Sequence, residues 1–265
     1  MKYRRLGKTD LLISRIGLGC SNMNPFERTK SEEVIKCALD LGINFFDTAN
    51  SYQAGLNEKL LGRILHPHWE KIIISTKLGY ASSLAGKAMN RILNMCGKDN
   101  HARPDSAFII RELERSLRHL KVDHIDLLQI HNPIVTKEMF DEMADLMESL
   151  IRQGKVRYYG VSFLDLGDFL LSLPFKYFCA QIPLNSGNSS EYLKQEYGVK
   201  RKEIGIIARQ PFVTLRKEAT QCGNVAPDIY RRALKEVLVM DSVDSVIMGT
   251  SNTNHLKANV QSVEA

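Results

Sequence analysis

An alternation of short apolar runs with amphipathic segments, repeated along the whole chain, most constrains the fold. Runs such as 43–47, 72–77 and 125–131 are rich in Ile, Leu and Phe and show little polar alternation. That pattern is typical of a parallel sheet that is covered on both faces. Eight such runs, each tied to a helical pattern, predict an α/β fold, namely a closed (β/α)8 TIM barrel rather than an open doubly wound sheet.

The same patterns set the expected element bounds. Strands are predicted at 16–19, 43–47, 72–77, 125–131, 156–162, 177–182, 204–209 and 246–249. Helices are predicted at 31–41, 57–65, 104–120, 137–153, 165–171, 190–197, 227–239 and 254–260. Ser31 is expected to cap the first helix. Segments 3–6 and 12–16, joined by a turn through Gly7, predict an N-terminal β-hairpin that plugs the lower end of the barrel.

Length and charge limit the domain count and the partners. The chain has 265 residues, 44% of them hydrophobic, which suits a single barrel domain over 1–265. The net charge of +6 is spread along the sequence without a block of Lys or Arg. This distribution argues against a nucleic-acid partner and suits a small ligand that carries phosphate.

Cysteine usage and hydropathy indicate the compartment. The number of cysteines is odd and their spacing is wide, which argues against a disulfide framework or a zinc site. They are Cys20, Cys37, Cys96, Cys179 and Cys222. The N-terminus is charged, unlike a signal peptide, and no apolar run approaches the ~18 residues that span a bilayer. We therefore expect a soluble cytoplasmic protein with no membrane partner.

Segment 79–103 interrupts the alternation, because it is rich in Gly, Ser and Asn and shows little periodicity. Long irregular loops in compact domains are usually functional or disordered. This loop follows the third predicted strand, on the active face of such a barrel. A substrate loop and a mobile insertion both remain open.

Ionisable residues stand where three successive predicted strands end. Asp47, Lys77 and His131 each follow an apolar run, and Tyr52 lies in the loop after Asp47. Barrel enzymes place catalytic groups at these strand ends. Any one of the residues alone has a plain structural explanation, such as a helix cap or a solvated strand end. Their joint occurrence favours a barrel enzyme with acid–base chemistry. A metal-dependent hydrolase is disfavoured, because only one of the groups is a histidine.

Several separated motifs then resemble those of the aldo-keto reductase family. They are the run from Asp47 through Thr48, Ala49, Asn50 and Ser51 to Tyr52, then Ser75-Thr76-Lys77, Gln129-Ile130-His131, Gly154 to Arg157 leading into Gly160-Val161-Ser162, and Val246 to Ser251 followed by His255, Leu256 and Asn259. The resemblance covers nearly the whole chain, and the motifs occur in the order of that family.

The resemblance implies reduction of an aldehyde or ketone by hydride transfer from NADPH. Tyr52 would be the general acid. A free tyrosine, with a pKa near 10, holds its proton too tightly to be an ideal acid near neutral pH. The Lys77 ammonium would favour its phenolate, and Asp47 would hold Lys77 in place. His131, as a neutral imidazole, would position the small-molecule carbonyl substrate.

The resemblance also implies the residues that bind the cofactor, NADP(H), with NAD(H) not excluded and no metal. Ser162 and Gln181 would hold the nicotinamide carboxamide, and Gly249, Thr250 and Ser251 a phosphate, with His255 and Asn259 at the adenine end. No G-x-G-x-x-G motif follows the first predicted strand, which argues against a Rossmann site.

The sequence departs from the family's pattern in three respects. Phe163 stands where an asparagine is usual. Arg209 stands where many members have an aromatic ring that stacks on nicotinamide, and its guanidinium plane is expected to stack instead. Gly249 and His255 replace a stronger Lys or Arg clamp on the 2′-phosphate.

Together with a short region at 212–226, the first two departures motivate an alternative. It is a nucleotide-binding regulatory barrel with little turnover. The physiological substrate and the oligomeric state are not specified by the sequence.

Overall fold

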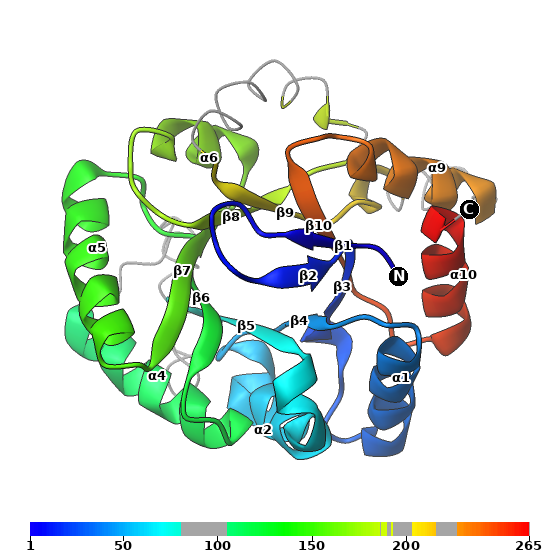
Figure 1. Cartoon of the computed structure of the whole chain (residues 1–265), viewed down its shortest axis with the longest axis horizontal. Coiled ribbons are helices and arrows are strands. Elements are labelled where there is room, and N and C mark those ends of the chain that lie inside the picture. Colours follow the sequence, from blue (N-terminus) through cyan, green and yellow to red (C-terminus); the bar gives the residue numbers. More distant parts are fainter. Residues whose placement is uncertain (81–104, 186, 190–191, 193–202, 216–226, 265) are drawn as a thin grey trace, which may run out of the picture.

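The computed structural model describes residues 1–80, 105–185, 187–189, 192, 203–215 and 227–264. Within these residues, eight parallel strands close into a ring in the order β10-β3-β4-β5-β6-β7-β8-β9, surrounded by helices (Figure 1). The first and last strands of the ring complete it, with Ile16 opposite Val246 and Leu18 opposite Met248. The predicted TIM barrel is confirmed.

The bounds of the elements follow the apolar pattern closely. The strands of the ring are β3 (Ile16–Gly19), β4 (Phe45–Asp47), β5 (Ile73–Leu78), β6 (Ile125–His131), β7 (Val156–Ser162), β8 (Cys179–Pro183), β9 (Gly205–Arg209) and β10 (Val243–Met248). The described helices are α1 (Arg28–Asp40), α2 (Leu56–Ile64), α4 (Ser106–Leu120), α5 (Lys137–Arg152), α6 (Leu166–Ser172), α9 (Pro227–Leu238) and α10 (Thr253–Glu264).

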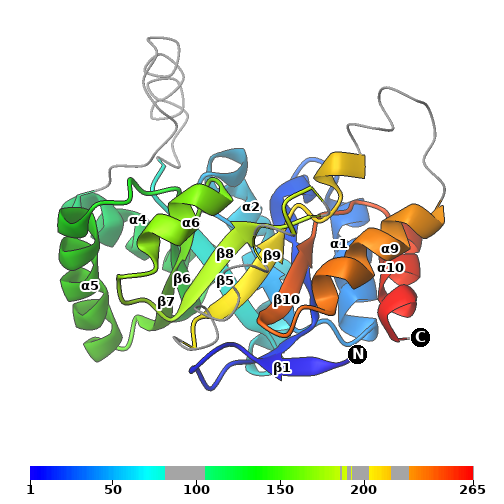
Figure 2. The ribbon, with the colours of Figure 1, turned by 90° about the horizontal axis from the view of Figure 1, so that it is seen from above.

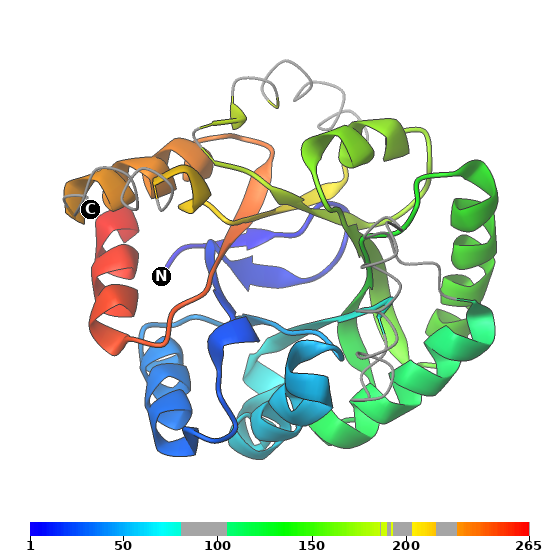
Figure 3. The same cartoon turned by 180° about the vertical axis from the view of Figure 1, so that it is seen from behind.

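The N-terminal hairpin closes one end of the ring. Its strands, β1 (Tyr3–Arg5) and β2 (Leu12–Ser14), pair antiparallel. Leu6, Leu11 and Ile13 are buried in one cluster with inward-facing strand residues, so the hairpin seals the interior of the barrel from water. Figure 2 shows it beneath the strands, and in Figure 3, from the opposite side, it lies behind the ring. The predicted hairpin is confirmed.

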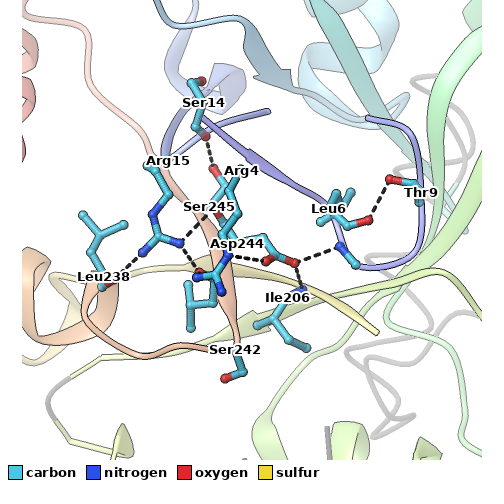
Figure 4. Close-up of polar contacts among 12 residues, drawn as sticks. Arg4, Leu6, Thr9, Ser14, Arg15, Ile206, Leu238, Ser242, Asp244 and Ser245 are labelled. Carbon is cyan, nitrogen blue, oxygen red and sulfur yellow. Dashed lines mark hydrogen bonds and ion pairs between the residues drawn. The ribbon is translucent and has the colours of Figure 1, made fainter. Parts of the chain in front are cut away.

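A polar contact also ties the hairpin to the ring (Figure 4). The carboxylate of Asp244 in β10 accepts hydrogen bonds from the backbone N–H groups of Gly7 and Ile206, both at 3.1 Å. Its other oxygen lies 3.3 Å from Nε of Arg4. Gly7 has φ +50°, and a Cβ there would lie 2.4 Å from the backbone nitrogen of Gly205. The close approach therefore requires glycine at the turn.

Three predicted boundaries of described elements differ by three or more residues, one of them the end of α10 at Glu264 instead of 260. Helix α1 begins at Arg28, and Ser31 does not cap it but exchanges hydrogen bonds with the backbone of Asn24. Strand β10 begins at Val243, three residues earlier than predicted, because its polar residues Asp244 and Ser245 are buried with hydrogen-bond partners. Polar residues inside a strand hide it from an apolar pattern.

Some predictions fall outside the described residues. They are most of the loop at 79–103, nearly all of the helix at 190–197, and Cys96 and Cys222. Of the other cysteines, Cys20, Cys37 and Cys179 are free and buried. No helix in the described ranges combines the length and the apolar character needed to cross a bilayer.

Candidate active site

A hollow of about 490 Å³ opens where the strands of the ring end. Its volume lies in the range of small-molecule sites, roughly 300–1,000 Å³. It is lined by Gly19 and by most of the predicted site residues, namely Asp47, Tyr52, Lys77, His131, Ser162, Gln181, Arg209 and Gly249. Thr250, Ser251, His255 and Asn259, at the start of α10, do not line it. The barrel thus brings the strand-end residues together, as the sequence predicts.

Asp47 and Lys77 form a buried ion pair at the floor of the hollow. The Nζ of Lys77 donates to Oδ2 of Asp47 at 2.6 Å and to the backbone carbonyl of Thr48 at 2.9 Å. The amides of Gln181 and Gln129 donate to the two carboxylate oxygens, at 3.1 and 3.5 Å. Only 2% of Lys77 and 4% of Asp47 is exposed, so the surrounding protein fixes both groups.

The Lys77 ammonium lies against Tyr52. Its Nζ is 5.6 Å from the centroid of the Tyr52 ring. Burial by itself lowers the pKa of Lys77, but Asp47 and Tyr52 together outweigh burial and raise the pKa above its usual value. Lys77 therefore remains an ammonium beside the phenol at neutral pH.

Tyr52 begins a short 3₁₀ segment, Tyr52–Gly55, whose backbone is unusual. Gln53, Ala54 and Gly55 all have positive φ, at +44°, +58° and +83°. Non-glycine residues hold that conformation only where their surroundings enforce it. Here Nε2 of Gln53 donates to the carbonyl of Ser21 at 3.0 Å. This turn sets the position from which the phenol enters the hollow.

Buried polar contacts behind the turn support the same region. Nδ2 of Asn50 donates to Glu112 of α4 at 2.9 Å. The hydroxyl of Thr76, next to Lys77, donates to Glu58 of α2 at 2.7 Å. Both carboxylates are almost fully buried. The loop before Tyr52 and the strand that carries Lys77 are thus each fastened to a helix outside the ring.

His131 ends β6 and enters the hollow as a neutral imidazole. Burial, followed by the charges of Lys77 and Arg209, lowers its pKa to about 3. Its Nδ1 has no hydrogen-bond partner within the described protein. The ring of Tyr80 meets it edge to face, with centroids 5.2 Å apart. In the described part of the chain, no group of three or more His, Cys, Asp or Glu side chains is placed to hold a metal ion.

Ser162 and Gln181 end up side by side and are suited to bind a carboxamide. They are paired residues of β7 and β8, and each is 1% exposed. Gln181 uses its amide nitrogen on Asp47, which leaves its buried Oε1 without a partner in the described protein. A hydroxyl beside a free amide oxygen complements the donor and acceptor of a carboxamide. The residues present therefore fit the nicotinamide end of a dinucleotide.

Arg209 reaches from the end of β9 across to the end of β7. Its Nη2 donates to the carbonyls of Phe163 and Leu164, at 2.6 and 3.1 Å. Phe163 is fully buried and packs against Phe169 outside the hollow. The residue at 163 thus contributes its backbone to the site, and its side chain to the core.

The start of α10 is capped by a side chain. Oδ1 of Asn252 accepts hydrogen bonds from the backbone N–H groups of Asn254 and His255, at 2.8 and 3.3 Å. Asn252 therefore satisfies two of the free N–H groups at the helix N-terminus. Gly249, Thr250 and Ser251 precede this cap, and both Ser251 and His255 are exposed.

Sequence reasoning missed several polar residues that line the hollow, among them Asn22, Asn132 and Gln210. Asn132 and Gln210 directly follow His131 and Arg209, and both have positive φ, at +48° and +58°. These turns redirect the chain just after a strand and aim polar groups into the hollow. An asparagine after a strand-end histidine, before Pro133, is a turn signal that points to this position.

Comparisons with known proteins agree with this arrangement. A model of the aldo/keto reductase family matches residues 15–214. The uncharacterized oxidoreductase YqkF of Bacillus subtilis is 27% identical over 100% of this chain and 92% of its own length. The aldo-keto reductase YhdN of the same species is 32% identical over 61% of this chain and 47% of its own length. The solved structure of aldo-keto reductase AKR11C1 from Bacillus halodurans, in its holo form, has 27% identity and a TM-score of 0.82, covering 100% of this chain and 91% of that one.

The fold and the site define a TIM barrel with Asp47, Lys77, His131 and Tyr52 gathered in one hollow at its strand ends. The chain belongs to the aldo/keto reductase family. The family and the oxidoreductase names of the relatives support an enzyme that acts on carbonyl groups of small molecules.

Proposed function

We propose that the protein reduces an aldehyde or ketone to an alcohol, with NADPH as the hydride donor and Tyr52 as the proton donor. The observation that carries the proposal is the Lys77 ammonium, paired with buried Asp47 and lying against the Tyr52 ring, in one hollow with Ser162 and Gln181. Carbonyl reduction adds a hydride to carbon and a proton to oxygen. The reduced nicotinamide, when bound, supplies the hydride.

The chain's own residues manage the proton. Tyr52 gives its phenolic proton to the carbonyl oxygen in reduction and takes one from the alcohol in oxidation. The Lys77 ammonium offsets the negative charge that forms on the phenol oxygen, and Asp47 holds that ammonium in place. His131, neutral at every ordinary pH, donates a hydrogen bond to the substrate oxygen and fixes its position.

The dinucleotide is proposed to lie between two groups of residues. Ser162 and Gln181 hold the carboxamide, with Arg209 beside them. Gly249, Thr250 and Ser251 take the phosphates, and His255 and Asn259 face the adenine end. The +6 net charge favours the more anionic NADP(H). None of the five residues proposed for the phosphates and the adenine end is a Lys or Arg.

The regulatory barrel is not favoured, because the four proton-transfer residues converge in one hollow and the relatives are named oxidoreductases. For localisation we propose the cytoplasm, on the basis of an odd, widely spaced set of cysteines.

Replacement of Tyr52 by phenylalanine tests the function. We expect Tyr52→Phe to lower kcat/KM for activated aldehydes by about 10²–10⁴-fold, the usual contribution of a general acid. The measurement is NADPH oxidation followed by absorbance, with calorimetric titration of NADPH and NADH to show that cofactor binding is retained and which nucleotide is preferred.

Tyr158→Phe is the matched control, because its hydroxyl lies at the hairpin end, where it accepts from the backbone of Asp10. The enzymatic proposal fails if Tyr52→Phe turns over aldehydes as fast as the wild type.

A further inference from the structure

Arg209 is a cation without a counter-charge of its own. Among the described residues that line the hollow, Asp47 is the one carboxylate, and it is paired with Lys77 at 2.6 Å. The guanidinium of Arg209 meets two neutral carbonyls through Nη2, and its buried Nε has no hydrogen-bond partner within the described protein. Within the described part of the chain, the hollow therefore carries one positive charge that no lining carboxylate compensates.

The position of this charge is fixed. The side chain starts at the end of β9, opposite Pro183 of β8, and ends at the carbonyl of Phe163, the residue after Ser162. It thus spans the ends of β7, β8 and β9, and β7 and β8 carry the Ser162 and Gln181 pair. Two hydrogen bonds to backbone carbonyls prevent the guanidinium from turning away toward solvent.

Burial strengthens the electrostatic effect of such a charge. The interior screens charges far less than water does. Burial lowers the pKa of Arg209 itself, while the charges of Tyr52 and Asp47 raise it. Its field also reaches Lys77 and His131, whose pKa values it lowers. The charge of Arg209 therefore reaches the ionisable groups at the strand ends in this hollow.

We propose that Arg209 makes the site distinguish the two redox forms of the nicotinamide, so that the reduced dinucleotide binds more tightly than the oxidised one. This inference rests on the proposed function. The reduced ring is neutral and the oxidised ring is a pyridinium cation, so a fixed neighbouring cation opposes only the oxidised form. The site is then loaded preferentially with the reduced dinucleotide and releases the oxidised one faster, and the potential of the bound couple is raised.

The test compares the dissociation constants of NADP⁺ and NADPH, both measured by calorimetric titration. The two forms share their phosphates and adenosine, so the ratio of the constants isolates the charge on the ring. Arg209→Gln keeps an amide donor for the carbonyls of Phe163 and Leu164 but removes the charge, whereas Arg209→Lys keeps the charge. Circular dichroism confirms that both variants fold.

We expect the dissociation constant of NADP⁺, divided by that of NADPH, to fall by about tenfold or more in Arg209→Gln. A tenfold change equals about 1.4 kcal/mol. In Arg209→Lys the ratio should stay close to that of the wild type. A tenfold change corresponds to about 30 mV in the potential of the bound two-electron couple.

Other results overturn the inference. An unchanged ratio of the two dissociation constants in Arg209→Gln contradicts the inference. If the KM for a carboxylate-bearing aldehyde rises at the same time, the charge serves substrate binding instead. If the wild type binds nucleotides but removal of the Arg209 charge leaves this ratio unchanged, the inference fails and the proposed function stands. If the wild type binds neither NADPH nor NADH, the proposed function fails with it.

Discussion

At the scale of single residues, the ion pair between Lys77 and Asp47 combines a structural role with the role in catalysis proposed above. Both groups are almost completely removed from water; Gln181 donates to the same carboxylate oxygen as Lys77, and Gln129 donates to the other. Desolvation of two charges is costly, and their attraction repays it only while both partners are present. Stability and chemistry therefore depend on the same contact.

Removal of one partner should be costly to the fold. We expect Lys77→Met to lower the free energy of unfolding by about 3–5 kcal/mol, because Asp47 is left buried without a counter-charge. The double variant Asp47→Asn/Lys77→Met should recover part of this loss. Urea denaturation followed by circular dichroism measures both. A double variant no more stable than Lys77→Met would contradict the buried-charge explanation.

His131 predicts a pH dependence of stability. Burial, then Lys77 and Arg209, lowers its folded-state pKa to about 3, whereas an unfolded histidine has a pKa of 6.5. Between these values the unfolded chain binds a proton that the folded chain does not, so stability falls as pH falls below 6.5.

The slope should reach at most about 1.4 kcal/mol per pH unit relative to His131→Gln, measured by urea denaturation at pH 7, 6 and 5. Parallel curves for the two proteins would show that the imidazole is not held neutral.

At the scale of elements, the hairpin and β10 are held together by a carboxylate whose environment opposes its charge. Burial raises the pKa of Asp244 to about 6, against the lowering effects of two backbone N–H groups and of Arg4 and Arg15. Below pH 3.8 the group is protonated in both states. From there to about pH 6 the folded chain alone retains the proton, so stability falls as pH rises.

We expect this tie to cost about 2 kcal/mol at pH 7 relative to pH 4, most of the energy of the pKa difference. Asp244→Asn should lack this component. Thermal unfolding of both proteins across pH 4 to 7, compared as a difference, separates Asp244 from the other titrating groups. A difference that does not change with pH would show that Asp244 remains ionised throughout.

Element type and order could be predicted from the sequence, since strands buried on both faces are almost purely apolar. The errors lie where tertiary contacts replace that pattern. Asp244 and Ser245 belong to β10 because backbone groups of the hairpin and of neighbouring strands satisfy them. The start of α1 was misplaced because Ser31 bonds to Asn24 rather than capping the helix. Neither contact leaves a local signal.

At the scale of the whole molecule, the candidate site could be predicted as far as barrel geometry alone defines it. A closed parallel ring sends every strand end to the same face, so Asp47, Lys77 and His131 had to meet. The cap formed by Asn252 and the polar turns at Asn132 and Gln210 depend on backbone conformations that residue type specifies only weakly. The cap and the two turns therefore could not be predicted from the sequence.

The hollow also crosses the line where the ring closes. Gly19 ends β3, Gly249 follows β10, and both form part of its wall, although they belong to opposite ends of the chain. The side chains proposed to transfer the proton come from the first half of the sequence, and those proposed to face the carboxamide come from the second. A nascent chain whose termini have not yet met can pair β4 with β5, but it lacks the wall that Gly19 and Gly249 form together. Ligand affinity is therefore expected to depend on closure of the ring.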